Sequence, residues 1–302
     1  MLDLSSYILI GIIAIGIGFL ASLFGIGGGF LLYPTMIFIA GMDVHSTVGT
    51  IPFVIVFMAF SSTLAYAKQK RIDYKITLLL VGASILGAVI GAFISIQTPS
   101  QILVILFGIV ELILAIILGV TKNPEQIYTD KKILKNSIII EEIIDHKKDN
   151  KVLDKKKKKW YLIYKHKIDA SGIEFNYKAN IILSLPISFL AGFLSSLLGI
   201  GGGSLYIQIF VFLCGMSIHM AIACSIFSIF ISTISSAITF AYLGEINYIV
   251  GFAIIIGMMI GAQLGSLTGK KIKSHYLRKL AAIMIIIIAI QMIVFAIIGK
   301  PT

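Results

Sequence analysis

The stretch Gly18-Phe-Leu-Ala-Ser-Leu-Phe-Gly-Ile-Gly-Gly-Gly29 recurs as Gly192-Phe-Leu-Ser-Ser-Leu-Leu-Gly-Ile-Gly-Gly-Gly203, which lies 174 residues further along the chain. Chance similarity between apolar segments does not keep glycines and polar residues in register over such a distance. The sequence therefore predicts a duplicated half. The same offset relates further pairs: Gly41-Met42 and Gly215-Met216, His45 and His219, Ser61-Ser62 and Ser235-Ser236, and Gly91 and Gly265.

The composition places both halves in a membrane. The chain has 302 residues, of which 58% are hydrophobic and 13% charged, and its mean hydropathy is +1.00. Soluble domains have about 45–50% apolar and about 25% charged residues, and disordered chains have far fewer apolar residues. Many apolar runs are long enough to cross about 30 Å of hydrocarbon as helices. We therefore expect an all-α polytopic membrane protein. The runs are 7–24, 29–41, 47–67, 76–96 and 101–120, followed by 180–198, 203–215, 218–243, 248–268 and 277–298.

Each half is predicted to be a glycine-broken helical hairpin followed by three transmembrane helices. The second run of each half is too short for a full upright crossing, and it follows Gly-Ile-Gly-Gly-Gly, where helix propensity is low. The chain then divides into a first transmembrane repeat at 1–121, a lysine-rich linker loop at 122–178 and a second repeat at 179–302.

The basic residues indicate how the two halves are oriented. In the first half they follow the third run, at 68–75, and in the second half they follow the fourth run, at 270–279. Because cytoplasmic loops are enriched in Lys and Arg, we expect the halves to be inserted upside down relative to each other. The linker is then cytoplasmic and both termini are extracytoplasmic. Inverted repeats are typical of alternating-access secondary transporters.

The net charge of +11 does not indicate nucleic-acid binding. Residues 122–178 hold 15 of the 25 Lys and Arg residues, and the others fall between apolar runs or near the chain end. No basic patch interleaved with aromatic residues lies on a foldable domain, so no nucleic-acid partner is expected. The simplest interpretation of the linker is a solvated loop, and the alternative is a stretch that binds anionic lipid.

The two glycine blocks are the candidate substrate site. Apart from Arg278 and Lys279 at the start of the last run, the apolar runs contain no Lys or Arg, so an anion inside them needs neutral donors. Each block precedes a helix start, where free N–H groups and the positive end of the helix dipole can bind an oxyanion. Close helix packing is the competing explanation of the glycines. The candidate binding residues are Gly25, Gly27, Gly28, Gly29, Gly199, Gly201, Gly202 and Gly203, together with Ser22, Ser196, Ser204 and Gln208.

Three ionisable residues are candidates for gating or proton coupling. His45 and His219 are repeat-equivalent and lie at the ends of the predicted hairpins, although a histidine there is also compatible with a simple interfacial role. Glu111 lies well inside an apolar run. A carboxylate at that depth is costly, so Glu111 is expected to be protonated, paired or functional.

Enzyme chemistry is not indicated. There is no HExxH motif and no pair of intramembrane aspartates, so no metal site is expected. The Gly25-x-Gly27 pattern lacks the βαβ unit that a dinucleotide site requires, and no cofactor is expected. Cys214 and Cys224 are too few for a disulfide framework.

The duplicated block G-F-x-[AS]-S-L-x-G-I-G-G-G and the segment Gly41-Met-x-x-His45-x-x-x-Gly49-Thr50 resemble the TauE/SafE sulfite exporter family, over about 8–120 and 181–298. The resemblance implies a transporter of sulfur-containing oxyanions or small organosulfonates that is driven by an ion gradient, of protons or sodium. It also implies binding roles for Thr50 and for Ser225. The family pattern does not account for the long lysine-rich linker.

The sequence thus favours a multi-pass protein of the cell membrane that transports a small sulfur-containing anion by alternating access. A membrane scaffold or sensor, whose linker recruits a partner and whose transporter body is degenerate, is the alternative. Two intact glycine breaks favour the transporter, because a scaffold does not need them. The sequence leaves the substrate, the coupling ion and the oligomeric state open.

Overall fold

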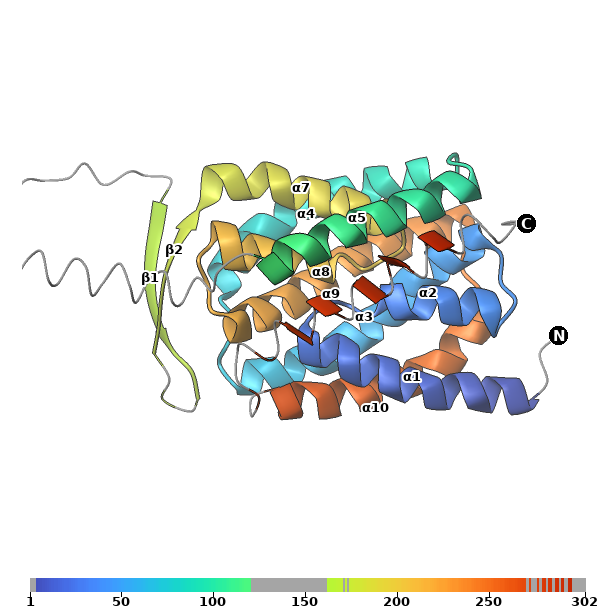
Figure 1. The fold of residues 1–302 in the computed structure, drawn as a ribbon, viewed down its shortest axis with the longest axis horizontal. Helices are drawn as coiled ribbons and strands as arrows, with labels where there is room; N and C mark the ends of the chain where they lie inside the picture. The colour runs from blue at the N-terminus through green and yellow to red at the C-terminus, as the bar shows by residue number, and fades with distance from the viewer. Residues whose placement is uncertain are drawn as a thin grey trace, which may run out of the picture.

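The computed structural model describes residues 4–120, 162–170, 172 and 174–269, with short pieces between 272 and 294. Its long helices lie side by side in one bundle, and a two-stranded sheet lies at one end (Figure 1). The predicted all-α membrane architecture is confirmed, and the helices coincide with the apolar runs to within a few residues. The run 277–298 falls largely outside the described residues. The helices are α1 (Leu4–Phe24), α2 (Gly29–Phe38), α3 (Val44–Lys68), α4 (Tyr74–Ser95), α5 (Ser100–Val120), α7 (Ile181–Leu197), α8 (Gly203–Gln208), the π-helical η1 (Ile209–Leu213), α9 (Ile218–Leu243) and α10 (Tyr248–Gly269).

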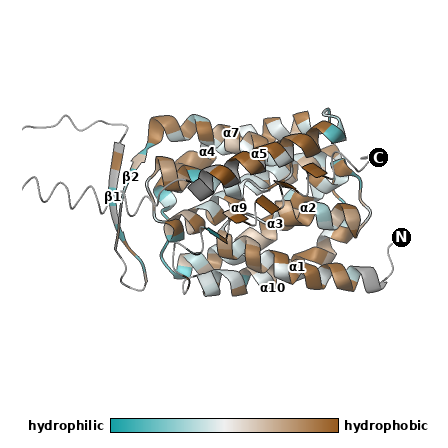
Figure 2. Cartoon of the chain, viewed as in Figure 1, coloured by the Kyte–Doolittle hydropathy of each residue, from teal (hydrophilic) through white to brown (hydrophobic). Residues whose placement is uncertain are grey.

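The outer surface of the bundle is apolar. Within the described part of the chain, five helices are long and apolar enough to cross a membrane; they lie within α1, α3, α4, α9 and α10. Large aliphatic side chains point outward along them, such as Ile256, which is 69% exposed, and Leu86, which is 63% exposed. Apolar residues run along almost the whole length of the helices in Figure 2. An apolar surface of this extent suits contact with lipid, and the chain is a multi-pass membrane protein.

The two halves pack through corresponding pairs of helices. Helix α1 of the first half lies along α10 of the second, and α7, the repeat equivalent of α1, lies along α4. The central helices α3 and α9 pack against each other. Glycines allow the two outer pairs to approach closely, because a Cβ on Gly261 would collide with the Ile15 carbonyl and one on Gly87 with the Phe189 carbonyl. These glycines are repeat-equivalent, which explains why the duplication preserves them.

The two basic loops lie at the same end of the bundle. In Figure 1, α1 runs from the end with the N-terminus toward the sheet, whereas α7 starts next to the sheet and runs the opposite way. Gln69, beside the first basic loop, donates a hydrogen bond to the carbonyl of Ser266, which lies just before the second. This arrangement is what the charge bias of the loops leads us to expect. The inverted insertion of the halves, and the domain bounds drawn from it, stay predictions.

The end of the linker forms a β-hairpin that we did not predict. Strand β1 (Leu162–Ile168) pairs antiparallel with β2 (Glu174–Asn180), with Leu162 opposite Asn180. Phe175, Tyr177 and Ala179 alternate along β2 and are buried. The signal was present in the sequence as this period-two alternation around the turn Asp169-Ala-Ser-Gly172. Strand β2 continues directly into α7, and residues 121–161 lie outside the described part.

The β-hairpin docks on the loop between α3 and α4, residues 69–73. Arg71 forms an ion pair of 3.0 Å with Asp169, and the exposed fractions of the two side chains are only 4% and 1%. Lys165 Nζ lies 2.7 Å from both carboxylate oxygens of Asp73, and the Tyr177 hydroxyl also donates to Asp73. The buried charges of Arg71, Asp169 and Asp73 are thus each paired with an opposite charge, as burial in a protein requires.

We predict that Gly261→Val destabilises the bundle, because the added side chain meets the backbone of α1. Overpacking of this kind costs about 1–3 kcal/mol or more. The melting temperature in detergent measures the effect. Gly82→Val is the matched control, since a Cβ on Gly82 has nothing within 4 Å. Equal melting temperatures for the two variants would contradict the close packing of α1 on α10.

Acid should release the β-hairpin only at very low pH. Burial raises the pKa of the Asp73 carboxyl, but hydrogen bonds from Lys165 and Tyr177 outweigh this and hold the pKa below its ordinary value of 3.8. A lowered pKa in the folded state stabilises docking above the ordinary value, and this contribution is lost as the pH falls through the lowered pKa. Hydrogen-exchange protection of β1 and β2, measured relative to unstructured peptides, should therefore persist from neutral pH to about 3.8 and fall below it. In Asp73→Asn, which lacks this carboxyl, the part of the acid transition that Asp73 contributes should disappear.

Candidate substrate site at the glycine turns

Each glycine block forms a tight turn that reverses the chain. Gly25, Gly27 and Gly28 have φ angles of 71°, 89° and 76°, in the left-handed region that glycine adopts without a steric penalty. The corresponding angles in the second half are 69°, 83° and 70°, at Gly199, Gly201 and Gly202. The two turns therefore have nearly the same backbone conformation. Helix α2, with its 10 residues, extends about 15 Å from the first turn, half of the roughly 30 Å hydrocarbon thickness.

The two turns face each other and contact backbone to backbone. A Cβ on Gly29 would collide with the Ile200 carbonyl, and one on Gly203 would collide with Ile26. A Cβ on Gly27 would lie 3.6 Å from the Gly203 nitrogen. Residues 25–29 and 199–203 are all buried. The structure thus brings the two predicted glycine blocks together, with Gly27 and Gly29 of the first against Gly199, Gly201 and Gly203 of the second.

The turns leave backbone N–H groups without partners. Gly28 and Gly202 precede α2 and α8, and neither helix has a side-chain cap. Within the described part of the chain, no N–H of Gly27–Gly29 or of Gly201–Gly203 donates a hydrogen bond. The first N–H groups of a helix lack intrahelical acceptors and carry the positive end of the helix dipole. Two such ends meet here, which suits a small oxyanion.

Ser196 adds a free hydroxyl beside the second turn. It is 0% exposed, and its Oγ makes no hydrogen bond. Ser22, its repeat equivalent, instead accepts a hydrogen bond of 2.9 Å from the Ser62 hydroxyl. A buried polar atom without a partner costs about 1–3 kcal/mol. The Ser196 hydroxyl therefore has no partner in the described chain, whereas the Ser22–Ser62 pair is already satisfied.

The other predicted hydroxyls hold the backbone in place. Ser225 Oγ lies 2.7 Å from the Gly25 carbonyl and 3.1 Å from the Gly203 carbonyl, so its proton links the two turns. Thr50 Oγ1 accepts from the Asn247 N–H at 2.9 Å, away from the turns. Ser204 and Gln208 are buried just after the second turn and make contacts of their own.

The two histidines lie at opposite ends of the bundle. His45 Nε2 is 3.1 Å from the Thr98 carbonyl, and its Nδ1 is 3.4 Å from the Ser100 hydroxyl. Because a carbonyl only accepts, the proton of a neutral His45 ring is on Nε2, and Nδ1 accepts from Ser100. His219 is half-buried near Arg71 and Asp169, at the end with the β-hairpin. Their predicted gating roles stay predictions, and the side chain of Glu111 lies outside the described residues.

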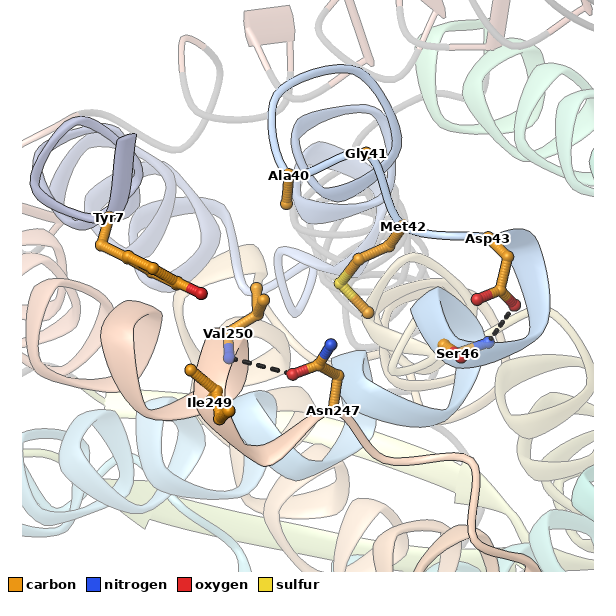
Figure 3. Close-up of a pocket in the computed structure, with 9 residues that line it drawn as sticks. All are labelled: Tyr7, Ala40, Gly41, Met42, Asp43, Ser46, Asn247, Ile249 and Val250. Atoms are coloured by element: carbon orange, nitrogen blue, oxygen red, sulfur yellow. Dashed lines mark hydrogen bonds between the residues drawn. The ribbon is translucent and has the colours of Figure 1, made fainter. Parts of the chain in front are cut away.

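A cavity of about 490 Å³ opens at the end of the bundle opposite the β-hairpin (Figure 3). The Tyr7 hydroxyl and the Asn247 amide point toward it in the close-up. Asp43 lies in the wall of the cavity. Burial raises the pKa of its carboxyl, but hydrogen bonds from Ser46 outweigh this and leave the pKa below its ordinary value, so Asp43 is an anion at neutral pH. The described lining contains no Lys or Arg. The cavity is thus a less favourable binding site for an anion than the glycine turns. Its lining is Tyr7, Ala40, Gly41, Met42, Asp43, Ser46, Asn247, Ile249 and Val250.

One polar contact near the second turn was not predicted. The hydroxyl of Tyr206 on α8 hydrogen-bonds to that of Ser84 on α4, and both side chains are buried. The contact joins the two halves. No local pattern indicates it, because the partners are 122 residues apart.

Comparison with known proteins agrees with this architecture. A protein 27% identical to this chain, over 95% of it and 97% of the relative, is the probable membrane transporter protein YunE of Bacillus subtilis. The probable membrane transporter protein MJ0441 of Methanocaldococcus jannaschii is 26% identical over 92% of this chain and 91% of its own. The sulfite exporter TauE/SafE family protein 6 of Arabidopsis thaliana is 21% identical over 93% of this chain and 78% of its own.

No solved structure matches the chain significantly. The family description "Sulfite exporter TauE/SafE" matches residues 9–292, which is almost the whole sequence. The chain therefore belongs to the TauE/SafE sulfite exporter family of membrane transporters.

Proposed function

We propose that the protein is a secondary-active transporter of a small sulfur-containing oxyanion, such as sulfite or an organosulfonate. The observation that carries this proposal is the meeting of two buried turns whose N–H groups have no partner in the described chain. The substrate class is suggested by the family description and by the name of the Arabidopsis relative. Membership of a transporter family also argues against an enzyme.

In this proposal the anion is held by neutral donors. It accepts hydrogen bonds from N–H groups of Gly27–Gly29 and Gly201–Gly203 and from the Ser196 hydroxyl, and the dipole ends of α2 and α8 balance its charge. Electrostatic interactions are stronger in a buried site than in water. A site without a full positive charge can still release its ligand, as a transport cycle requires. Ser225 and Thr50 contribute by holding the turns and the adjoining loop.

The packing of the halves supports a proposed alternating-access cycle. The pairs α1–α10 and α4–α7 flank the central contact of α3 with α9. Rocking of one flank against the other would open the turns to each end in turn. His45, His219 and Glu111 remain the candidates for coupling to protons or to sodium. The expected orientation places both termini outside the cell membrane and the β-hairpin in the cytoplasm.

We do not favour the alternative of a scaffold or sensor. A degenerate transporter body would not need to keep two matching turns, with φ angles that agree to within a few degrees at three positions in each half.

Gly27→Ala should weaken sulfite binding at least tenfold, because the new methyl group would lie 3.6 Å from the Gly203 nitrogen and cover its N–H. The nearest side-chain atom is Ile229 Cδ1 at 3.3 Å, at the flexible end of its side chain, so the fold can adjust. Binding is measured as thermal stabilisation of the purified protein by sulfite, sulfate, thiosulfate and methanesulfonate.

The matched control is Gly244→Ala. Gly244 also has a positive φ, of 77°, and a Cβ there has nothing within 4 Å. It therefore shares the left-handed backbone strain, about 1–2 kcal/mol, without approaching the turns. A folded Gly27→Ala protein that binds as tightly as the parent would falsify the turn site.

Ser196→Ala and Ser22→Ala should have opposite effects. Ser196→Ala should weaken sulfite binding by about 1.5–3 kcal/mol, the value of a hydrogen bond to a charged group, while leaving the melting temperature of the unliganded protein equal or higher. Ser22→Ala breaks the hydrogen bond from Ser62 and should lower that melting temperature. Thermal melts with and without sulfite distinguish the two. The same pattern in both variants would argue against a ligand at Ser196.

A further inference from the structure

The loop between α3 and α4, residues 69–73, connects several elements at one end of the bundle. Gln69 Nε2 donates to the Ser266 carbonyl of α10 at 3.1 Å. The Asp73 N–H donates to Cys224 Sγ of α9 at 3.3 Å. The β-hairpin binds the same loop, through Arg71–Asp169, through Lys165 and Tyr177 on Asp73, and through a hydrogen bond of 3.0 Å from the Ala170 N–H to the Gln69 carbonyl.

The opposite end has the same backbone contact without the β-hairpin. Asn247 is the repeat equivalent of Asp73, and Thr50 is the equivalent of Cys224. The Asn247 N–H donates to Thr50 just as the Asp73 N–H donates to Cys224. Among the described residues no strand covers Asn247, which instead lines the cavity of about 490 Å³. The two ends therefore differ in one respect that matters here: a carboxylate is bound by the β-hairpin at one end, and an amide faces a cavity at the other.

The ion pair at Asp73 fastens α7 to the end of α3. Strand β2 continues into α7 without a loop, while Asp73 lies in the short loop after α3 and also caps α4. These helices come from different halves of the duplication. Opening at this end is taken to move α7 away from the end of α3, while residues 69–73 stay with α3, where Gln69 contacts α10. The Lys165–Asp73 pair and the buried Arg71–Asp169 pair would then have to break.

We propose that the β-hairpin is a clamp that keeps this end of the transporter closed, and that release of Asp73 from Lys165 is the step that opens it. The inference rests on the alternating-access function proposed above, since it requires an end that opens. The β-hairpin would regulate opening at this end, which the duplicated helices do not do by themselves. The clamp acts at one end only, so it makes the two otherwise equivalent ends unequal.

Cys224 provides a native reporter for the clamp. It is fully buried beneath Asp73, so its thiol reacts with N-ethylmaleimide only when this end opens. In full-length protein carrying Cys214→Ser, we expect Lys165→Gln to raise the labelling rate of Cys224 about tenfold, equivalent to about 1.4 kcal/mol. Lys75→Gln removes an exposed lysine at the same end whose side chain makes no hydrogen bond or ion pair with the described β-hairpin, and it should leave the rate unchanged.

Asp73→Asn is the second test of the clamp. It installs the amide that Asn247 carries naturally, and its side-chain oxygen can still cap α4 as Asp73 does. We expect it to raise the labelling of Cys224 as Lys165→Gln does. If both variants label at the parent rate, the clamp is wrong.

A reporter at the other end separates opening from unfolding. With Thr50→Cys as the only cysteine, Lys165→Gln should leave labelling unchanged or lower, because the clamp acts at the β-hairpin end. A rise at both reporters means general unfolding and overturns the proposal. The labelling assay contains no substrate, so its outcome is independent of the sulfite-binding measurements. Either proposal can thus fail while the other is still tested.

Discussion

The contact between the two glycine turns is the constraint on which the rest of the structure depends. Residues 25–29 and 199–203 approach so closely that a Cβ on Gly29 or on Gly203 would strike the opposite backbone. This contact fixes where α2 and α8 begin. It also leaves their first N–H groups without acceptors, in a buried place where water cannot replace them. The same feature that joins the halves thus creates the polar site between them.

The proposed site would attract an anion through partial charges and not through a full positive charge. A buried arginine would bind an oxyanion strongly, but its own desolvation is costly in a membrane. Helix ends and a serine hydroxyl supply only partial charges, which are less costly to leave unpaired in an empty site than a buried full charge is. In the described chain, full charges are paired where they are buried, as at Arg71–Asp169 under the β-hairpin. The molecule therefore keeps strong charge pairs at one end and weak donors at its centre.

Duplication gives the protein two similar ends, and a few residues make them different. Thr50 and Cys224 each accept a hydrogen bond from the backbone of the next loop, at positions related by the repeat. Asp73 in one loop and Asn247 in the other differ by one charge, and only the carboxylate attracts Lys165. In the proposed clamp, the two ends are made unequal by one carboxylate of the duplicated body and by a β-hairpin outside it.

The sequence by itself determined the membrane class and the helices, because these depend on local composition. It also determined the duplication and the position of both glycine turns, because the two halves can be aligned at a constant offset. Alternation in β2 also marked the β-hairpin, although its length and its place in a lysine-rich segment concealed it. Only the tertiary structure decided which polar groups are free. Ser196 has no partner whereas Ser22 has one, and Thr50 and Ser225 are occupied by backbone groups. Such pairing depends on contacts between residues as many as 200 positions apart, and no local pattern encodes those contacts.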